Sequence, residues 1–199
     1  MRRGGMTTIH DMVMGPPVEG RTCGECVACC KVLGINEPDL FKPADQMCMH
    51  CTGQGCGIYP ARPAVCRTWH CAWMRIPTMP AETRPDRMGV VFTLDRQPKP
   101  LTPFDRLYFV GRAVDDSAAL ETQAARDTAA MFAQGPLPVF LAWGENRLLV
   151  YPRAELADAI LKPETAADPA LVEEGLRWME AYKPFAAVAD ESVRQAAKA

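Results

Sequence analysis

The sequence has no long apolar run, no surplus of basic charge and no cysteine over most of its length, and each absence excludes a class of protein. A helix that spans a bilayer needs roughly 18 apolar residues, whereas the longest candidate, residues 137–143, is short and interrupted by Pro138. The net charge of −2 lacks the excess of Lys and Arg with which nucleic-acid binders displace counterions. We therefore expect neither a membrane protein nor a nucleic-acid-binding protein.

The first residues also lack the apolar segment of a secretory signal, although they include two arginines. We therefore expect a cytoplasmic protein, in which thiols stay reduced and disulfides are rare. The chain has nine cysteines, an odd number that cannot all pair within one molecule. Thiols that serve as metal ligands or redox groups are thus favoured over a disulfide framework.

The signatures of two common enzyme classes are missing as well. The sequence contains no Gly-x-Ser-x-Gly, so it does not indicate a serine hydrolase of that type. It also contains no glycine-rich strand–loop–helix pattern for a nucleotide-like cofactor. The sequence identifies no catalytic residue, and it leaves open whether the protein is an enzyme.

All nine cysteines lie between Cys23 and Cys71, and this distribution divides the chain. Residues 1–22 have no periodicity and predict a loose N-terminal arm. Residues 23–75 are rich in Cys, Gly and Pro and poor in aliphatic side chains, so we expect a small metal-binding module with little regular structure that is held together by metal. Residues 76–199 contain ordinary secondary-structure patterns and are expected to pack on this module.

Residues 76–199 predict an α+β region of about four strands and three to four helices. Strands are predicted at 88–94, 107–114, 139–143 and 147–151, the last two as a hairpin with a three-residue loop at 144–146. Helices are predicted at 118–132, 152–161 and 169–182, and Pro184 is expected to separate a last polar segment. Shorter helical turns are predicted near 27–33 and 61–69. The fold class is therefore α+β.

The spacing of the cysteines is the strongest functional signal. C-x-x-C brings two sulfurs to the same side of a turn, where both reach one metal ion. The spacing occurs twice in succession in CGECVACC and again in CMHC. The adjacent pair Cys29–Cys30 serves two neighbouring ions, or two corners of a cluster, more easily than one ion. The predicted metal ligands are Cys23, Cys26, Cys29, Cys30, Cys48, Cys51, Cys56, Cys66 and Cys71.

The pattern leaves the identity of the metal open. Leu33 stands where the bacterial ferredoxin run has its fourth cysteine, so a plain ferredoxin is excluded. Two clean C-x-x-C pairs make a zinc finger or ribbon but leave the other cysteines unexplained. Nine thiolates also suit about three bridged tetrahedral ions or two four-iron clusters, and His50 or His70 can substitute for a sulfur. Zinc, iron and an iron–sulfur cluster are all compatible with the count.

Other side chains within or beside this segment are expected to support the site. Nearby cations stabilise a buried cluster of thiolates, and Lys31, Arg62, Arg67 and Arg75 are the candidates. Met47 and Met49 flank Cys48, but thioethers mainly suit copper(I). We therefore expect both methionines to fill the core.

The string CGECVACC and the later string GCGIYPARPAVCR, residues 55–67, resemble the CxxCxxCC cysteine-cluster family, also called YkgJ-like proteins. The resemblance covers about residues 23–71 and implies zinc- or iron-chelating cysteines at Cys23, Cys26, Cys29, Cys30, Cys48, Cys56 and Cys66. One branch of the family has a further cysteine at the position of Cys71, and many members have leucine at the position of Cys51. Another branch, flagellin lysine N-methylase, joins a similar module to a methyl-transfer activity.

The leading expectation is a protein that binds zinc or iron, or an iron–sulfur cluster, through the cysteine module. A metal- or iron–sulfur-dependent enzyme, such as a protein N-methyltransferase or an oxidoreductase, is the alternative. That enzyme needs an open metal position or a pocket between the module and the α+β region. A third expectation is a zinc-stapled module that binds an unidentified protein partner.

Overall fold

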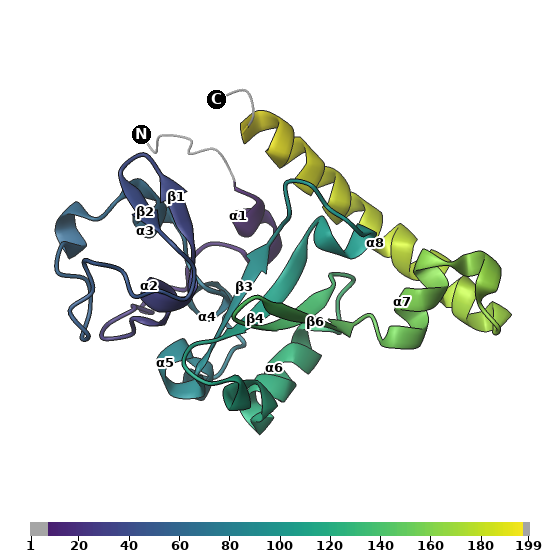
Figure 1. The fold of residues 1–199 in the computed structure, drawn as a ribbon, viewed down its shortest axis with the longest axis horizontal. Coiled ribbons are helices and arrows are strands. Elements are labelled where there is room, and N and C mark those ends of the chain that lie inside the picture. Colours follow the sequence, from purple (N-terminus) through teal and green to yellow (C-terminus); the bar gives the residue numbers. More distant parts are fainter. Residues whose placement is uncertain (1–7, 197–199) are drawn as a thin grey trace.

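The computed structural model describes residues 8–196, with side chains described through Glu191. Within this range the protein is mixed α+β, with eight α-helices, a two-stranded sheet and a four-stranded sheet, and the predicted fold class is confirmed. Figure 1 shows the cysteine-rich residues on one side of the four-stranded sheet and helix α7 on the other. No helix among the described residues is long and apolar enough to cross a membrane.

The four predicted strands form one sheet in the order β3–β4–β5–β6. They span Val90–Asp95 (β3), Tyr108–Ala113 (β4), Val139–Trp143 (β5) and Asn146–Tyr151 (β6). β3 pairs antiparallel with β4, β4 pairs parallel with β5, and β5 and β6 form an antiparallel hairpin. The hairpin loop has two residues rather than the predicted three, because Trp143 pairs directly with Asn146 and Gly144 adopts a left-handed φ of 54°.

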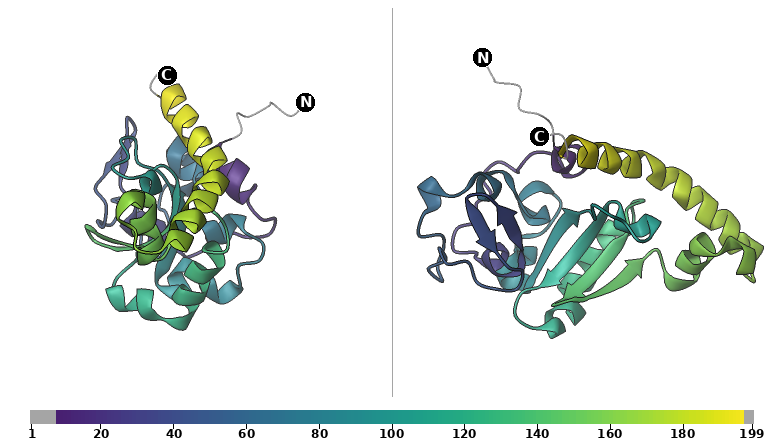
Figure 2. Two further views of the ribbon diagram at one scale, coloured as in Figure 1. Left: turned by 90° about the vertical axis from the view of Figure 1, so that its right-hand side faces the viewer. Right: turned by 45° about the horizontal axis from the view of Figure 1, so that its top comes forward.

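Aromatic side chains fix the helices on this sheet. Helix α6 (Gln123–Phe132) stacks Phe132 on Phe109, with ring centres 4.1 Å apart. Helix α8 (Pro169–Ala196) is anchored by Tyr182, whose hydroxyl donates to the Leu107 carbonyl and accepts from the Leu107 amide. Helix α7 (Ala154–Leu161) packs along α8, and Figure 2 shows the far end of α8 beside helix α1. The main core is thus built largely from residues outside the cysteine-rich segment.

Two helix predictions were wrong in detail. The helix predicted at 118–132 is a 3₁₀ turn, Ser117–Glu121, followed by α6, because Thr122 is extended and its hydroxyl accepts from the Ala125 amide as a new N-cap. The helix predicted to end near residue 182 continues through Pro184 to the end of α8. Proline removes one helical hydrogen bond there. Burial of Ala186 and Ala189 in the main core holds the second half of α8 in place.

The prediction of a loose N-terminal arm was wrong for the residues that the structure describes. Ile9–Met14 form helix α1, whose start is capped reciprocally by Thr8 and Asp11. Ile9 and Met14 are buried in the main core. Arg75 is buried and donates to Asp11 at 2.7 Å, and this bond holds the pKa of the Asp11 carboxyl at about 2. Residues 1–7 of the predicted arm lie outside the described residues.

The cysteine-rich segment is built from short elements. They are α2 (Ala28–Val32), β1 (Ile35–Glu37), β2 (Leu40–Lys42), α3 (Ala64–Thr68) and α4 (Ala72–Arg75), and α5 (Pro85–Met88) then leads into β3. The two predicted helical turns are confirmed as α2 and α3. The β1–β2 hairpin was not predicted, because three-residue strands show too little alternation. Ala28 and Val32 pack against Val91 of β3 in a second, smaller core, and the division of the chain at residue 75 stays a prediction.

Candidate metal centre

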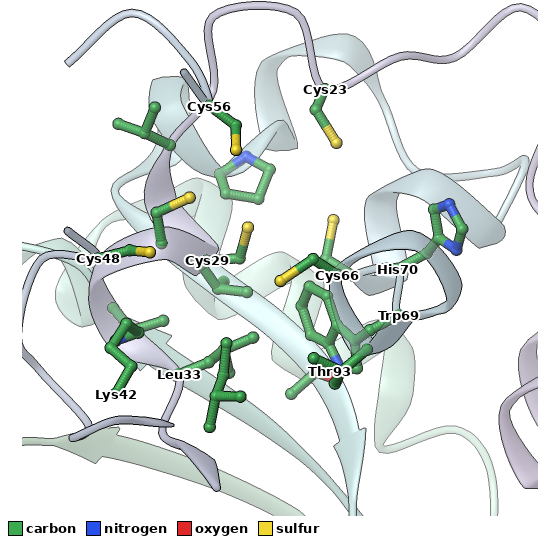
Figure 3. Close-up of a pocket in the computed structure, with 18 of the residues that line it drawn as sticks. Cys23, Cys29, Leu33, Lys42, Cys48, Cys56, Cys66, Trp69, His70 and Thr93 are labelled. Carbon is green, nitrogen blue, oxygen red and sulfur yellow. The ribbon is translucent and has the colours of Figure 1, made fainter. Parts of the chain in front are cut away.

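All nine cysteines line one cavity between the cysteine-rich segment and the face of the four-stranded sheet that carries Val91 and Thr93. The cavity has a volume of about 520 Å³. All nine thiols are free; Cys71 is buried and the other cysteines are half-buried, so water reaches the group. Figure 3 shows the sulfurs of Cys23, Cys29, Cys48 and Cys56 pointing into the same space. The fold therefore brings all the predicted ligands to one place.

Backbone turns position the first four cysteines. The Cys26 amide donates to the Cys23 carbonyl at 2.9 Å, which closes the first C-x-x-C turn. Gly24 takes a left-handed φ of 54° in this turn, a conformation that favours glycine. Helix α2 then carries Cys29 and Cys30 side by side. These local turns bring the first four sulfurs close together in sequence order, and the packing of α2 on Val91 of β3 holds them beside the sheet.

The second group of cysteines is tied to the first through the backbone. The Cys48 amide donates to the Cys30 carbonyl at 2.9 Å, and the Cys51 amide donates to the Cys48 carbonyl at 3.0 Å. Cys51 and Cys56 face each other in an isolated antiparallel bridge, so the intervening loop returns the chain to the cavity. Cys51 is therefore as much a part of the group as its neighbours, although the resembling family often has leucine at its position.

Two short helices position the last two cysteines. Cys66 lies in α3, which starts directly after Pro63. The Arg67 guanidinium donates to the Arg62 carbonyl at 2.8 Å and does not line the cavity. Cys71 is the residue before α4 and packs in the smaller core with α2. These helices complete the wall of the cavity opposite the second group.

Three of the thiols influence one another's protonation. Hydrogen bonds from Cys29 and Cys51, aided by the Lys42 ammonium, lower the pKa of the Cys30 thiol to about 6. The bond to Cys30 and burial raise the pKa of Cys29. Burial also raises the pKa of Cys71 to about 11. The surroundings of Cys30 thus favour its thiolate, which is the form of cysteine that ligates metal.

Positive charge lies next to the thiols. The Lys42 side chain is only 4% exposed, and its ammonium donates to three backbone carbonyls at 2.7 to 3.0 Å. Its charge acts on Cys30 and Cys48. Arg62 also lines the cavity, with its guanidinium 4.0 Å from the centre of the Tyr59 ring. These two cations favour ionised sulfur in a partly buried site.

Two more of the cations that the sequence predicted to stabilise the thiolates do not lie beside them. Lys31 pairs with Asp115 and Arg75 pairs with Asp11, and neither cation lines the cavity. Lys42 was missed because the hairpin that carries it was missed. Its burial beside the cysteines is visible only in the structure, so no local pattern could have identified it.

The two histidines and the two methionines have different surroundings. His50 and His70 both line the cavity, but the Nδ1 atom of His70 lies 3.1 Å from the Thr68 carbonyl oxygen, and Figure 3 shows its ring at the margin of the group. Met47 and Met49 are 50% and 81% exposed, so the expectation that they fill the core was wrong. Their loop runs along the surface, where no core is available to them.

Comparison with known proteins does not assign the site. No family model, curated protein or solved structure matches this chain. The resemblance to the CxxCxxCC family therefore stays a prediction, and the chemistry of the site rests on its own residues.

The donor atoms fit a thiophilic metal, but they do not form a closed coordination sphere. Within residues 8–196, no three His, Cys, Asp or Glu side chains lie close enough together to hold an ion between them. A zinc–sulfur bond is about 2.3 Å long, whereas these sulfurs surround a cavity of about 520 Å³. Ion binding therefore requires the sulfurs to move closer together.

The cavity also includes side chains that the sequence did not connect with the cysteines. Thr93 and Asp95 of β3 follow Val91 on the same face of the strand, because successive side chains alternate between faces. Arg112, opposite Val91 on β4, and His10 of α1 line the cavity as well. Only the packing of the segment on the sheet brings these residues together, so no local pattern could have identified them.

Proposed function

We propose that this protein binds zinc or iron through the thiolates of the cavity described above. The observation that supports the proposal is that nine free thiols, from several turns and helices between Cys23 and Cys71, line one cavity. Thiolates select soft or borderline ions such as zinc and the irons of iron–sulfur clusters. Zinc would hold the turns of the cysteine-rich segment together, whereas iron would add electron-transfer chemistry.

The number of donors argues for more than one ion. Nine thiols exceed the roughly four positions of one tetrahedral ion, and bridging sulfurs join neighbouring ions. Cys30, which follows Cys29 in α2 and accepts the Cys48 amide at its carbonyl, is the candidate for such a bridge. Residues 43–58, all of them described, contain no helix and no strand beyond the single bridge at Cys51 and Cys56. This loop can therefore adjust as the sulfurs close on the ions.

We also propose that the protein is cytoplasmic and chelates metal. Reduced thiols in this number fit a cytoplasmic protein, and the resemblance to the CxxCxxCC family fits a metal-chelating role. A metal-dependent enzyme is the second candidate, because the cavity extends from the thiols to the sheet. A pocket between the cysteine segment and the sheet is the feature that such an enzyme needs.

Substitution of Cys30 tests the proposal. Cys30→Ser should lose about half or more of the bound metal, because a bridging sulfur serves two ions. Cys29→Ser should lose a similar share. The measurement is elemental analysis of protein purified without oxygen, together with circular dichroism to confirm the fold.

Met49→Leu is the matched control, because it removes an exposed sulfur next to Cys48 that does not line the cavity. Its metal content should equal that of the wild type. Equal metal loss from Cys30→Ser and Met49→Leu, or no loss from either, would contradict a thiolate site centred on Cys30.

A further inference from the structure

The cavity is larger and chemically more varied than a thiolate site requires. Its volume of about 520 Å³ lies in the range of pockets for small organic molecules, roughly 300–1,000 Å³. Most of its wall is apolar and includes Leu33, Trp69 and Val91, with Thr93, Asp95 and Arg112 beyond them on the sheet. Figure 3 shows Leu33, Trp69 and Thr93 across the space from Cys23 and Cys56. An apolar wall with a few polar groups is typical of ligand sites.

The charged side chains of the cavity wall are mostly positive. Apart from the thiols and histidines, the charged residues that line it are the cations Lys42, Arg62, Arg96 and Arg112 and the carboxylate Asp95. The Lys42 ammonium already donates to three backbone carbonyls, and Asp95 pairs with Arg112 at 2.8 Å. A positive charge is therefore left over at the end of the cavity where the sheet lies.

Arg96 carries that charge. It directly follows β3 and is half-buried. Among the described side chains, its guanidinium has no ion-pair or hydrogen-bond partner, and only its backbone amide is used, donating to Asp95 at 2.8 Å. An arginine presents paired donors that match a carboxylate. An anion from outside the chain is the partner that this position lacks.

We propose that the cavity binds a small organic acid, with its carboxylate at Arg96 and its apolar body against Leu33, Trp69 and Val91. The wall continues to the thiols, so the other end of the bound molecule lies beside them. If metal is bound at the thiols, the acid lies next to it, as the substrate of a metal enzyme does. This part of the proposal rests on the proposed function. Binding of the acid itself rests only on the cavity, its apolar wall and Arg96.

Calorimetric titration with phenylbutyrate, compared with the neutral analogue phenylbutanol, tests this proposal. The wild-type protein should bind the acid at least about tenfold more tightly than the alcohol, because the two differ by one charge-assisted contact. Arg96→Gln should remove that preference and leave the metal content unchanged. The matched control is Arg106→Gln, which removes an exposed arginine paired with Asp190 and should retain the preference.

The outcomes separate this proposal from the metal proposal. Equal binding of acid and alcohol, no binding of either, or an acid preference that survives Arg96→Gln would overturn the acid site. Loss of the preference in both arginine variants would overturn it too, because the effect would then follow total charge. Acid preference in protein that is purified without oxygen and contains no metal would support the acid site, and the lack of metal would overturn the metal proposal.

Discussion

Complete removal of metal should unfold the cysteine-rich segment and leave the four-stranded sheet folded. Ordering one residue costs about 1–2 kcal/mol, and fully burying one valine returns about 1.5–3 kcal/mol. Among the largest fully buried side chains of the described residues, Val32 is the only one between Cys23 and Cys71. The segment therefore has too little apolar burial of its own and depends on its thiols being held together by metal.

Hydrogen exchange with and without a chelator measures this directly. The amides of Cys26, Cys48 and Gly57 bond within the segment and should lose protection when the metal is removed. The amides of β3 and β4 should keep theirs, since these strands belong to the main core. Zinc or iron added back should restore the original pattern. Protection of the segment that is unchanged after complete metal removal would contradict the account.

Arg21→Ala should lower the free energy of unfolding by about 2–4 kcal/mol. The Arg21 guanidinium donates to the carbonyls of Trp73, Ile76, Pro77 and Met79, the last at 2.8 Å, and lies 4.8 Å from the centre of the Trp73 ring. One side chain thus fixes the chain where it leaves the last cysteine and enters the main core. Without it, these carbonyls lose a charged donor and only partly regain water.

Chemical denaturation of Arg21→Ala and Arg106→Ala measures this difference. Arg106 is a fair control because its guanidinium pairs with Asp190 at the surface, where an ion pair contributes about 1 kcal/mol or less. Arg21→Lys should recover only part of the loss, since an ammonium cannot reach several carbonyls in the planar arrangement of a guanidinium. If the Ala variants at 21 and 106 were equally stable, the bonds of Arg21 would have no structural importance.

The sheet could be predicted from the sequence because its signals are local. β3 and β4 are runs of apolar residues, and β5 and β6 flank a turn, so each strand lies within two residues of its predicted position. Pro184 misled the prediction for the opposite reason. Its local signal favours a break, whereas the burial of Ala186 and Ala189 depends on a core that is visible only in three dimensions.

The cysteines of the candidate site could be predicted from the sequence, whereas most of its other residues come together only in three dimensions. The spacing of the cysteines identifies them as candidate ligands, and all nine of them line one cavity in the structure. The contributions of Lys42, Arg96 and Arg112 depend on how the hairpin and the sheet pack around the cavity, and a lone lysine or arginine carries no spacing signal. Cys51 and Cys56 meet through a loop that no periodicity describes.

The most direct test of the central claim is the metal content per chain of protein purified without oxygen, measured together with its visible spectrum and a titration of free thiols. We predict more than one zinc or iron per chain and thiols that become titratable only after chelation. A colourless protein would indicate zinc, and a brown one that also contains inorganic sulfide would indicate an iron–sulfur cluster. A folded protein with nine titratable thiols and well below one metal ion per chain would contradict the account.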